Sequence, residues 1–428
     1  MIAGSASGVG KTVTTLALIA GLQADGYTVQ TAKAGPDFID PSHHAALAGK
    51  PSRTLDVWMQ GEDGVRENYA RGTGDLCLVE GVMGLYDGDV SSTAHVAEVL
   101  DLPIILVIDG SARMESVAAE ALGYRAYAED AGRDIDVVGI IAQQVHGGRH
   151  EAGIREALPD DMQYFGRIPE KQELEIPDRY LGLHLGDEHP ISTDELEAAA
   201  EQLAIEQVVS VARRPRVSDC VETAAPTRNR IAVARGAGFR FCYPAVIEQL
   251  RSTAQVIPFS PVNGDDVPAC DGVYLPGGYP ERYAAELATC PAIETIQERA
   301  CNEIPILGEC GGMMVLANSL ETRDGETYSM AGVLPAAVRM EERLQALDHV
   351  ELEAQIDVIT AGRGERLRGH EFHYSAAEVD DDAAFAFTVR RGNGISEGRD
   401  GLVEYATLGT YCHVHAASGA FGRFLEEC

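Results

Sequence analysis

Lysine is scarce in this chain of 428 residues. The lysines are Lys11, Lys33, Lys50 and Lys171. Long apolar runs are missing as well, because none approaches the ~18 uninterrupted apolar residues of a membrane-spanning helix. No leader of charged, then apolar, then small residues opens the chain. We therefore expect a soluble, cytoplasmic protein that has no membrane as a partner.

Paired cysteines and basic charge are lacking too. The nine cysteines form no Cys-x-x-Cys pair, and their odd number argues against a disulfide framework or a zinc knuckle. Sixty-seven acidic residues against 34 basic ones leave a net charge of −33, which repels nucleic acid and anionic lipid. The acidic residues are spread along the whole chain, so we interpret them as an adaptation to a high-salt cytoplasm. An acidic partner-binding protein is the alternative.

Two series of alternating strands and helices divide the chain. The first series contains four apolar runs that predict buried strands: 27–33, 76–81, 104–110 and 137–145. A polar, proline-containing stretch without periodicity follows, and a second alternating series begins after it. We therefore predict two doubly wound α/β domains, at 1–214 and 230–428, joined by a linker at 215–229.

The stretch "GSASGVGKT", from Gly4 to Thr12, has the composition of a phosphate-binding loop. Its first glycine stands one place too early for the common G-x-x-x-x-G-K-[ST] pattern. Backbone N–H groups at the start of a helix still converge on phosphate oxygens, Lys11 can neutralise phosphate charge, and the Thr12 hydroxyl can take Mg²⁺. The predicted nucleotide-binding residues are therefore Gly8, Gly10, Lys11 and Thr12. A glycine-rich turn that opens an ordinary helix is the alternative.

The spacing of this loop is similar to that of dethiobiotin synthetase-like P-loop enzymes, which implies the same fold for the first domain. The residues Met1, Ile2 and Ala3 precede the loop, whereas a central strand usually has about five or six residues. We expect either an abnormally short first strand or a true start upstream of Met1, and we favour the second.

Carboxylates follow the predicted strands of the first domain. Asp37 and Asp40 come after one strand in a turn that prolines stiffen, and Glu80 ends another. A carboxylate at the carboxyl end of a parallel strand points into the ligand crevice, where Mg²⁺ takes hard oxygen ligands. We predict that these three carboxylates act at a Mg–ATP site, with Thr12, Asp37 and Glu80 as metal ligands. Asp109 is a weaker candidate, and a capping turn is the alternative for Asp37 and Asp40.

The stretch "ILGECGGMMVL" at 306–316 predicts a strand, a tight turn and a helix. This is a nucleophile elbow with cysteine in place of serine, and its glycines let backbone pass close to a strained residue. We predict Cys310 as the nucleophile, with a thiol pKa lowered at the helix start, and His413 as its base. The N–H groups of Gly278 and Gly311 would form an oxyanion hole. A buried structural cysteine is the alternative.

This second domain resembles the class I glutamine amidotransferases, whose usual sequence near the base is H-x-E. His413 follows "GTYC" and matches the base, whereas His415 takes the place of the glutamate. A Cys–His pair can work without an acid, and the role of His415 stays open. A Mg–ATP site joined to a glutaminase indicates that ATP activates an acceptor while L-glutamine supplies ammonia.

Further motifs resemble those of the corrinoid glutamine amidotransferases, and specifically the family of cobyrinic acid a,c-diamide synthases. They are "AKAGPDFIDPSHH", "TLDVWM", "VEGVMGLYDG", "PDRYLGL", "LPGGYPE", "GECGGMM" and "GHEFHYS", in the family's order over essentially the whole chain. The resemblance implies that ATP phosphorylates a carboxylate of cobyrinic acid and that ammonia crosses between the domains to displace phosphate, at the a and c acetates. It implies the same roles as above for Lys11, Thr12, Asp37, Asp40, Glu80, Cys310 and His413.

Some positions depart from the family pattern, and some alternatives stay open. Gln143 stands where the family usually has Asn, a base contact, and Tyr180 stands where it has His. Ni-sirohydrochlorin a,c-diamide synthases perform the same reaction on another tetrapyrrole and share these motifs. A P-loop regulatory ATPase with an inactive glutaminase-like domain is the alternative from a different class. The sequence does not identify the oligomeric state, for which a homodimer is one option.

Overall fold

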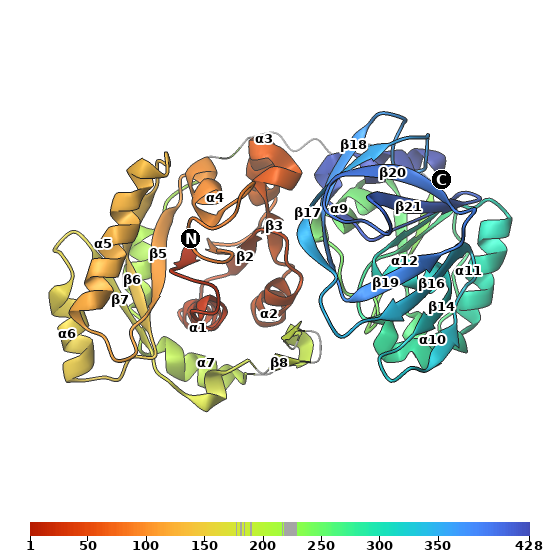
Figure 1. Ribbon diagram of the computed structural model, residues 1–428. Helices are drawn as coiled ribbons and strands as arrows, with labels where there is room; N and C mark the ends of the chain where they lie inside the picture. The colour runs from red at the N-terminus through yellow and green to blue at the C-terminus, as the bar shows by residue number, and fades with distance from the viewer. Residues whose placement is uncertain (177, 180–181, 184, 189–190, 216, 218–228) are drawn as a thin grey trace. The chain divides into compact units, whose positions relative to one another are not determined.

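The computed structural model describes residues 1–176, 178–179, 182–183, 185–188, 191–215, 217 and 229–428. The chain divides into two units, Met1–Val221 and Glu222–Cys428, which are described separately below (Figure 1). Most of the predicted linker at 215–229 and Tyr180 of the "PDRYLGL" stretch lie outside the described residues. Within the described part of the chain, no helix is long and apolar enough to cross a membrane.

The first unit is built on a parallel sheet with the strand order β3-β2-β4-β1-β5-β6-β7. Its strands are β1 (Ile2–Gly4), β2 (Val29–Ala34), β3 (Arg53–Leu55), β4 (Leu76–Glu80), β5 (Pro103–Asp109), β6 (Asp136–Gln143) and β7 (Gln163–Ile168). The four apolar runs of the first series form β2, β4, β5 and β6, so the predicted parallel α/β sheet is confirmed.

Helices cover both faces of this sheet because alternate residues of each strand face opposite sides. In β5, Ile104 and Leu106 belong to one buried apolar cluster, and Ile105 and Val107 belong to the other. The first cluster includes residues of α3 (Val57–Ala70), α4 (Thr93–Leu100), α5 (Glu115–Asp130) and α6 (Arg149–Ala157). The second includes residues of α1 (Lys11–Ala24), α2 (Ile39–Ala48), α7 (Thr193–Ala200) and α8 (Ile205–Val211). Each face of the sheet is thereby shielded from water.

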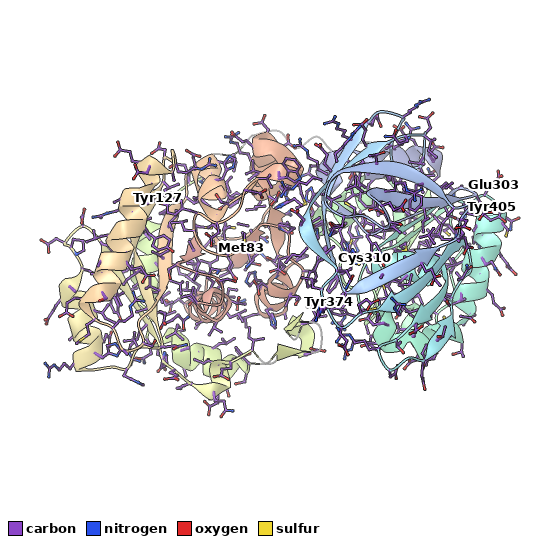
Figure 2. All side chains as sticks on the ribbon, in the orientation of Figure 1. Met83, Tyr127, Glu303, Cys310, Tyr374 and Tyr405 are labelled. Carbon is purple, nitrogen blue, oxygen red and sulfur yellow. The ribbon has the colours of Figure 1, made fainter. Side chains whose placement is uncertain are left out.

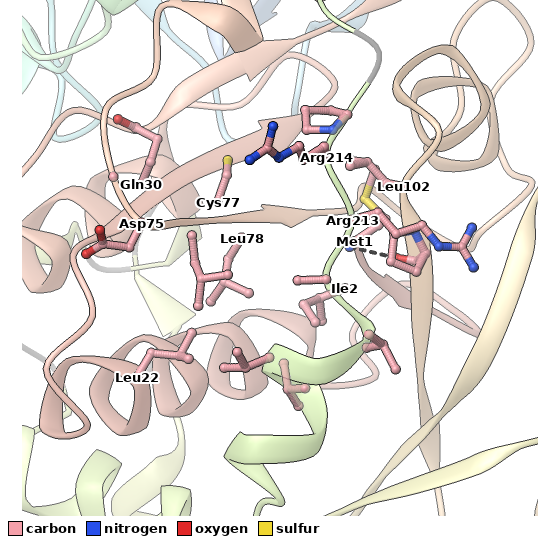
Figure 3. Close-up of a pocket in the computed structure, with 18 of the residues that line it drawn as sticks. Met1, Ile2, Leu22, Gln30, Asp75, Cys77, Leu78, Leu102, Arg213 and Arg214 are labelled. Atoms are coloured by element: carbon pink, nitrogen blue, oxygen red, sulfur yellow. Dashed lines mark hydrogen bonds between the residues drawn. The ribbon is translucent and has the colours of Figure 1, made fainter.

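The short central strand β1 is fully buried and pairs with β4 on one side and β5 on the other. The backbone nitrogen of Met1 donates to the carbonyl of Pro103 at 3.0 Å (Figure 3). A cavity of about 280 Å³ lies at this amino-terminal end of the strands, lined by Met1, Leu22, Cys77 and Leu102 among others. The loop that follows Gly4 leaves from the other end of β1, so the cavity is remote from the predicted phosphate site.

The second unit is built on a ten-stranded sheet whose order is β11-β10-β12-β13-β22-β21-β20-β17-β18-β23. Its parallel part contains β10 (Arg230–Ala234), β11 (Gln255–Phe259), β12 (Gly272–Leu275), β13 (Ile306–Glu309) and β22 (Thr407–Thr410). Antiparallel strands continue it: β17 (Ala346–Ala354), β18 (Arg366–His373), β20 (Ala384–Arg391), β21 (Arg399–Glu404) and β23 (His413–Val414). The parallel part is the predicted α/β sheet, whereas the antiparallel extension was not predicted.

Helices and a second sheet complete this unit. The helices are α9 (Pro244–Thr253), α10 (Ala284–Ala288), α11 (Pro291–Cys301), α12 (Gly311–Leu316) and α13 (Ala420–Glu427). The second sheet has the order β15-β14-β16-β19 and contains β14 (Ala317–Glu321), β15 (Thr327–Ser329), β16 (Leu334–Met340) and β19 (Ser375–Val379). The turn between β13 and α12 carries the predicted cysteine elbow.

Candidate active sites

The loop between β1 and α1 holds Gly8 and Gly10 in the left-handed region, with φ of +74° and +91°. A residue with a side chain is strained in that region, so both positions favour glycine. The buried side chain of Lys11 donates to the carbonyl of Ala6 at 3.0 Å and to that of Met83 at 2.7 Å. Lys11 therefore links its own loop to the loop that follows β4.

Behind this loop, side chains from three elements form a cluster around Lys33. The Thr12 hydroxyl lies 3.2 Å from Asp40 Oδ1 and 3.1 Å from Glu80 Oε1. Lys33 Nζ donates to Asp40 Oδ2 at 2.5 Å, to Glu80 Oε1 at 2.8 Å and to the carbonyl of Gly81 at 3.1 Å. Two of the predicted carboxylates thus meet Thr12 at the carboxyl ends of the strands, with an unpredicted ammonium group between them.

Burial and charge pairing oppose each other in this cluster. Burial alone would lower the pKa of Lys33, but the carboxylates of Asp40 and Glu80 outweigh it and raise this pKa above its usual range. Burial would likewise raise the pKa of Asp40 and Glu80, yet the ammonium of Lys33 holds both below their usual values. Burial, followed by the charge of Lys33, lowers the pKa of Lys11. The cluster therefore contains the ionised carboxylates of Asp40 and Glu80 beside the protonated ammonium of Lys33.

Asp37 lies at the edge of the cluster. Its Oδ1 accepts a bond from the backbone nitrogen of Ile39 at 2.8 Å, at the start of α2, and its Oδ2 is 3.9 Å from Lys33 Nζ. Burial and the nearby charge of Asp40 raise the pKa of Asp37 well above its usual value. The geometry thus favours the capping-turn alternative for Asp37. It is Asp40 that contacts both Thr12 and Lys33 inside the cluster.

Sequence reasoning missed two members of this cluster, Lys33 and His44. His44 Nε2 lies 2.6 Å from Glu80 Oε2, and its Nδ1 lies 3.3 Å from Ser52 Oγ. Two signals were available. Lys33 stands in the otherwise uncharged run 29–34, and His44 follows Asp40 by four residues, which places both on one face of α2. Asp109, in contrast, accepts a bond from the backbone nitrogen of Ser111 at 2.8 Å.

Gln143, at the end of β6, supports the phosphate loop. Its Nε2 donates to the carbonyl of Gly10 at 2.8 Å and to the hydroxyl of Thr14 at 2.5 Å. A Cβ atom on Gly10 would lie 2.6 Å from this amide group. The amide therefore fixes the first turn of α1 in the arrangement described.

In the second unit, Cys310 occupies a strained turn between β13 and α12, with φ +47° and ψ −105° (Figure 2). Its backbone nitrogen donates to the carbonyl of Thr410 at 2.6 Å. A Cβ atom on Gly312 would lie 1.9 Å from the carbonyl oxygen of Leu275, and one on Gly311 would lie 2.9 Å from the nitrogen of Gly278. Both glycines are therefore required for this elbow geometry.

His413 lies at the same turn. It is the first residue of β23 and is buried. If Gly277 carried a Cβ atom, that atom would lie only 2.2 Å from His413 Cε1, so the imidazole packs directly against Gly277. Gly277 precedes Gly278, whose backbone lies against Gly311 beside the nucleophile. The structure thus brings the predicted nucleophile, base and oxyanion glycines to one "PGG" turn. The ring of His370 stacks on that of His413 with centroids 5.0 Å apart.

The pKa values of this pair differ from the sequence expectation. Burial raises the pKa of the Cys310 thiol to about 12, and burial lowers that of His413 to about 3. A lowered thiol pKa was expected from the helix start, but α12 has six residues, and the desolvation of a thiolate outweighs its dipole. The resting pair is a neutral thiol and a neutral imidazole.

His415 and Glu309 complete the surroundings of the elbow. His415 Nδ1 accepts a bond from the backbone nitrogen of Ala417 at 3.2 Å, and its ring packs 5.1 Å from that of Tyr243. Glu309 Oε1 accepts a bond from the backbone nitrogen of Val414 at 3.0 Å. Burial raises the pKa of Glu309 to about 7. Sequence reasoning did not single out Glu309, although it adjoins the nucleophile.

Comparison with known proteins assigns both units. Residues 1–183 match the CobQ/CobB/MinD/ParA nucleotide binding domain, and residues 230–421 match the CobB/CobQ-like glutamine amidotransferase domain. The cobyrinate a,c-diamide synthase of Halobacterium salinarum is 58% identical over 426 residues, which cover 100% of this chain and 97% of that protein. The chain belongs to the cobyrinate a,c-diamide synthase family.

Other members of the cobyrinate a,c-diamide synthase family give the same result. The synthase of Haloarcula marismortui is 58% identical over 428 residues, with 99% of this chain and 98% of that protein covered. A relative named hydrogenobyrinate a,c-diamide synthase, from Stutzerimonas stutzeri, is 39% identical over 391 residues, with 88% and 86% covered. The predicted family, the glutamine amidotransferase class and the nucleotide-binding first domain are therefore confirmed. Two of these relatives are halophilic homologues, as the acidic composition predicts.

Proposed function

We propose that this protein amidates the a and c acetate carboxylates of cobyrinic acid, with ATP as the activating co-substrate and L-glutamine as the ammonia source. The observation that carries the proposal is the presence of two complementary sites in one chain. The first unit has a phosphate loop beside a carboxylate–lysine cluster, and the second has a strained cysteine elbow beside a buried histidine.

In the first unit, the loop from Gly4 to Thr12 binds the phosphates of ATP through its backbone N–H groups and Lys11. A carboxylate oxygen of the substrate attacks the γ-phosphorus, the bond to the β–γ bridging oxygen breaks, and ADP leaves. Lys33 would offset the negative charge of the carboxylates beside the phosphates, because its ammonium stands between Asp40 and Glu80. The product of this step is an acyl phosphate of the substrate.

The oxygen donors of this cluster suit Mg²⁺, although the described residues contain no group of three or more His, Cys, Asp or Glu side chains arranged to hold a metal. Mg²⁺ normally keeps several waters and takes only one or two protein oxygens beside the phosphates. Thr12, Asp40 and Glu80 would hold it, with Asp40 preferred over the predicted Asp37 because Asp40 contacts Thr12. A bound Mg²⁺ would neutralise phosphate charge during transfer.

In the second unit, the thiol of Cys310 attacks the side-chain amide carbon of glutamine, and its proton passes to His413. The oxyanion that forms is stabilised by the N–H groups of Gly278 and Gly311. His413 returns the proton to the departing nitrogen, so ammonia leaves and a thioester remains. Water hydrolyses the thioester to glutamate, and ammonia displaces phosphate from the acyl phosphate.

The name of the Stutzerimonas stutzeri relative raises the question of the metal state of the substrate. The test is a competition assay at high salt, with cobyrinic acid, hydrogenobyrinic acid and Ni-sirohydrochlorin offered together with ATP, Mg²⁺ and glutamine. Mass spectrometry of the products reports which tetrapyrrole becomes a diamide. Preferred amidation of cobyrinic acid supports the proposal, and amidation of Ni-sirohydrochlorin alone, or no amide at all, contradicts it.

The oligomeric state is a separate part of the proposal. We propose a homodimer, which predicts twice the mass of a 428-residue chain in light scattering at high salt. A monomer mass under the conditions of the assay would contradict it.

A further inference from the structure

Glu309 is a buried carboxylate that joins three strands of the second unit. It ends β13, directly before Cys310, and only 2% of its surface is exposed. Its Oε2 accepts a bond from the Tyr274 hydroxyl of β12 at 2.6 Å, and its Oε1 accepts one from the backbone nitrogen of Val414 in β23 at 3.0 Å. The second bond ends on the peptide that links His413 to Val414.

The position of β23 in the sheet gives this bond its importance. β23 pairs with β18 through His370 and Gly369, and in the strand order it stands at the opposite end from β11, six places from β13. The chain reaches it from β22 through residues 411 and 412, after leaving the neighbourhood of β13 at Thr410. The described backbone ladder therefore does not pair β23 with β13, and the side chain of Glu309 makes a direct link.

We propose that Glu309 is the positioning residue of the glutaminase site, which holds the peptide after His413 in register with the elbow that carries Cys310. This inference rests on the proposed function, because it assigns these two residues as base and nucleophile. In the usual H-x-E arrangement a glutamate follows the base, but His415 stands there in this chain and accepts a bond from Ala417. Here the carboxylate comes from the residue before the nucleophile and acts on the backbone of the base.

The chemistry explains why this contact affects the rate. Proton transfer from Cys310 to His413 requires the thiol and imidazole to stay within hydrogen-bond reach, and misplacement by about 1 Å can lower a rate about 100-fold. Glutamine binding depends less on this alignment, so the effect falls on kcat rather than on KM. Tyr274 donates to the other oxygen and fixes the carboxylate in turn.

The chain offers a control in Asp271. This carboxylate directly precedes β12 in the same unit, and its Oδ2 accepts a bond from the backbone nitrogen of Arg230, at the start of β10, at 2.8 Å. Asp271→Ala removes the same kind of contact, but at the amino-terminal ends of strands that do not carry the base. A difference between the Glu309 and Asp271 variants therefore separates positioning of the base from loss of a backbone contact elsewhere in the unit.

The test measures glutaminase kcat and KM, together with ammonium-supported amidation, in Glu309→Ala, Glu309→Gln, Glu309→Asp and Asp271→Ala. We expect Glu309→Ala to lower glutaminase kcat about 100-fold with KM changed less than about threefold. Glu309→Gln keeps an acceptor oxygen for Val414 and recovers most of kcat, and Asp271→Ala keeps the wild-type value. Ammonium-supported amidation stays at the wild-type level in every variant.

Hydrogen exchange gives a readout that does not require glutaminase activity. In Glu309→Ala the peptide containing residues 411–415 should lose protection, and in Glu309→Gln it should keep it. If Glu309→Ala does not fold, Glu309→Asp retains the charge but shortens the reach, and should show the same loss of kcat and protection in weaker form. Wild-type kcat and protection in Glu309→Ala, or equal losses in Glu309→Gln or Asp271→Ala, would overturn the inference. An inactive wild type with normal protection changes in the variants would instead refute the proposed function.

Discussion

Replacement of Lys33 by Met should destabilise the first unit in a strongly pH-dependent way. The ammonium of Lys33 has three partners within 3.1 Å, and its side chain is 3% exposed. Removing one member of a buried ion pair costs about 3–5 kcal/mol, because it leaves an uncompensated buried charge. Met keeps the length and volume of the side chain, so little of this loss comes from a cavity.

The pH dependence follows from the direction of the pKa shifts. Lys33 lowers the pKa of Asp40 and Glu80 in the folded wild type. The stability that this provides is fully present above about pH 5, beyond the unfolded pKa values, and is lost as the pH falls through the folded values. In the variant, burial without a cation raises both pKa values instead. We therefore expect Lys33→Met to lower the free energy of unfolding by about 3–5 kcal/mol at pH 8, and by less than half of that amount at pH 5.

Trp58 provides the assay, since it is the single tryptophan of the chain and lies in α3 of the first unit. Denaturant unfolding is followed by its fluorescence at pH 5 and pH 8 in high salt. Lys50→Met is the matched control, because Lys50 donates to the carbonyl of Thr73 at an exposed position. If Lys33→Met lowers the free energy of unfolding by less than about 1 kcal/mol, or by the same amount at both pH values, the proposed role of Lys33 in the cluster is refuted.

Three further outcomes are expected. Gly10→Ala should weaken ATP binding at least about tenfold in calorimetry. Gly26→Ala is the control, because Gly26 has a similar φ of +89° but no atom within 4 Å of the added Cβ, and it should leave ATP binding unchanged. Equal effects of the two substitutions would contradict the role of the loop. Glu80→Gln should lower ATP-dependent amidation about 100-fold and spare glutamine hydrolysis, and an unchanged amidation rate would exclude Glu80 from the site. Without glutamine, iodoacetamide should label the neutral thiol of Cys310 more slowly than the exposed thiol of Cys301 from pH 5 to pH 8. Peptide mass spectrometry measures the two labelling rates, and equal rates would contradict the raised pKa of Cys310.

The parts of the sites that follow from strand position could be predicted from the sequence. Glu80 ends an apolar strand, and the carboxyl ends of parallel strands meet at one edge, so its approach to Thr12 follows from the pattern. The elbow at Cys310 follows in the same way from a strand, its glycines and a helix. In both cases local sequence fixes the backbone, and the backbone fixes the side chain.

The parts that depend on tertiary packing were missed. Lys33 acquires its role only when β2 and β4 pair, with Lys33 opposite Glu80 in the register. Glu309 contacts Val414, which is 105 residues away, because β22 pairs with β13 and the chain continues directly from β22 into β23. The antiparallel extension could have been recognised from the period-2 pattern of strands such as β17, in which Val350, Leu352 and Ala354 are buried, but period-2 patterns do not reveal which strands pair.

The source of the amide nitrogen tests the central claim most directly. Wild-type protein and Cys310→Ala are each incubated with ATP, Mg²⁺ and cobyrinic acid, with glutamine labelled by ¹⁵N at its side-chain amide or with ¹⁵N-ammonium. We predict a doubly labelled diamide from wild type with either source, and from Cys310→Ala with ammonium alone. A labelled product from glutamine in Cys310→Ala, or no labelled product in wild type, would contradict it.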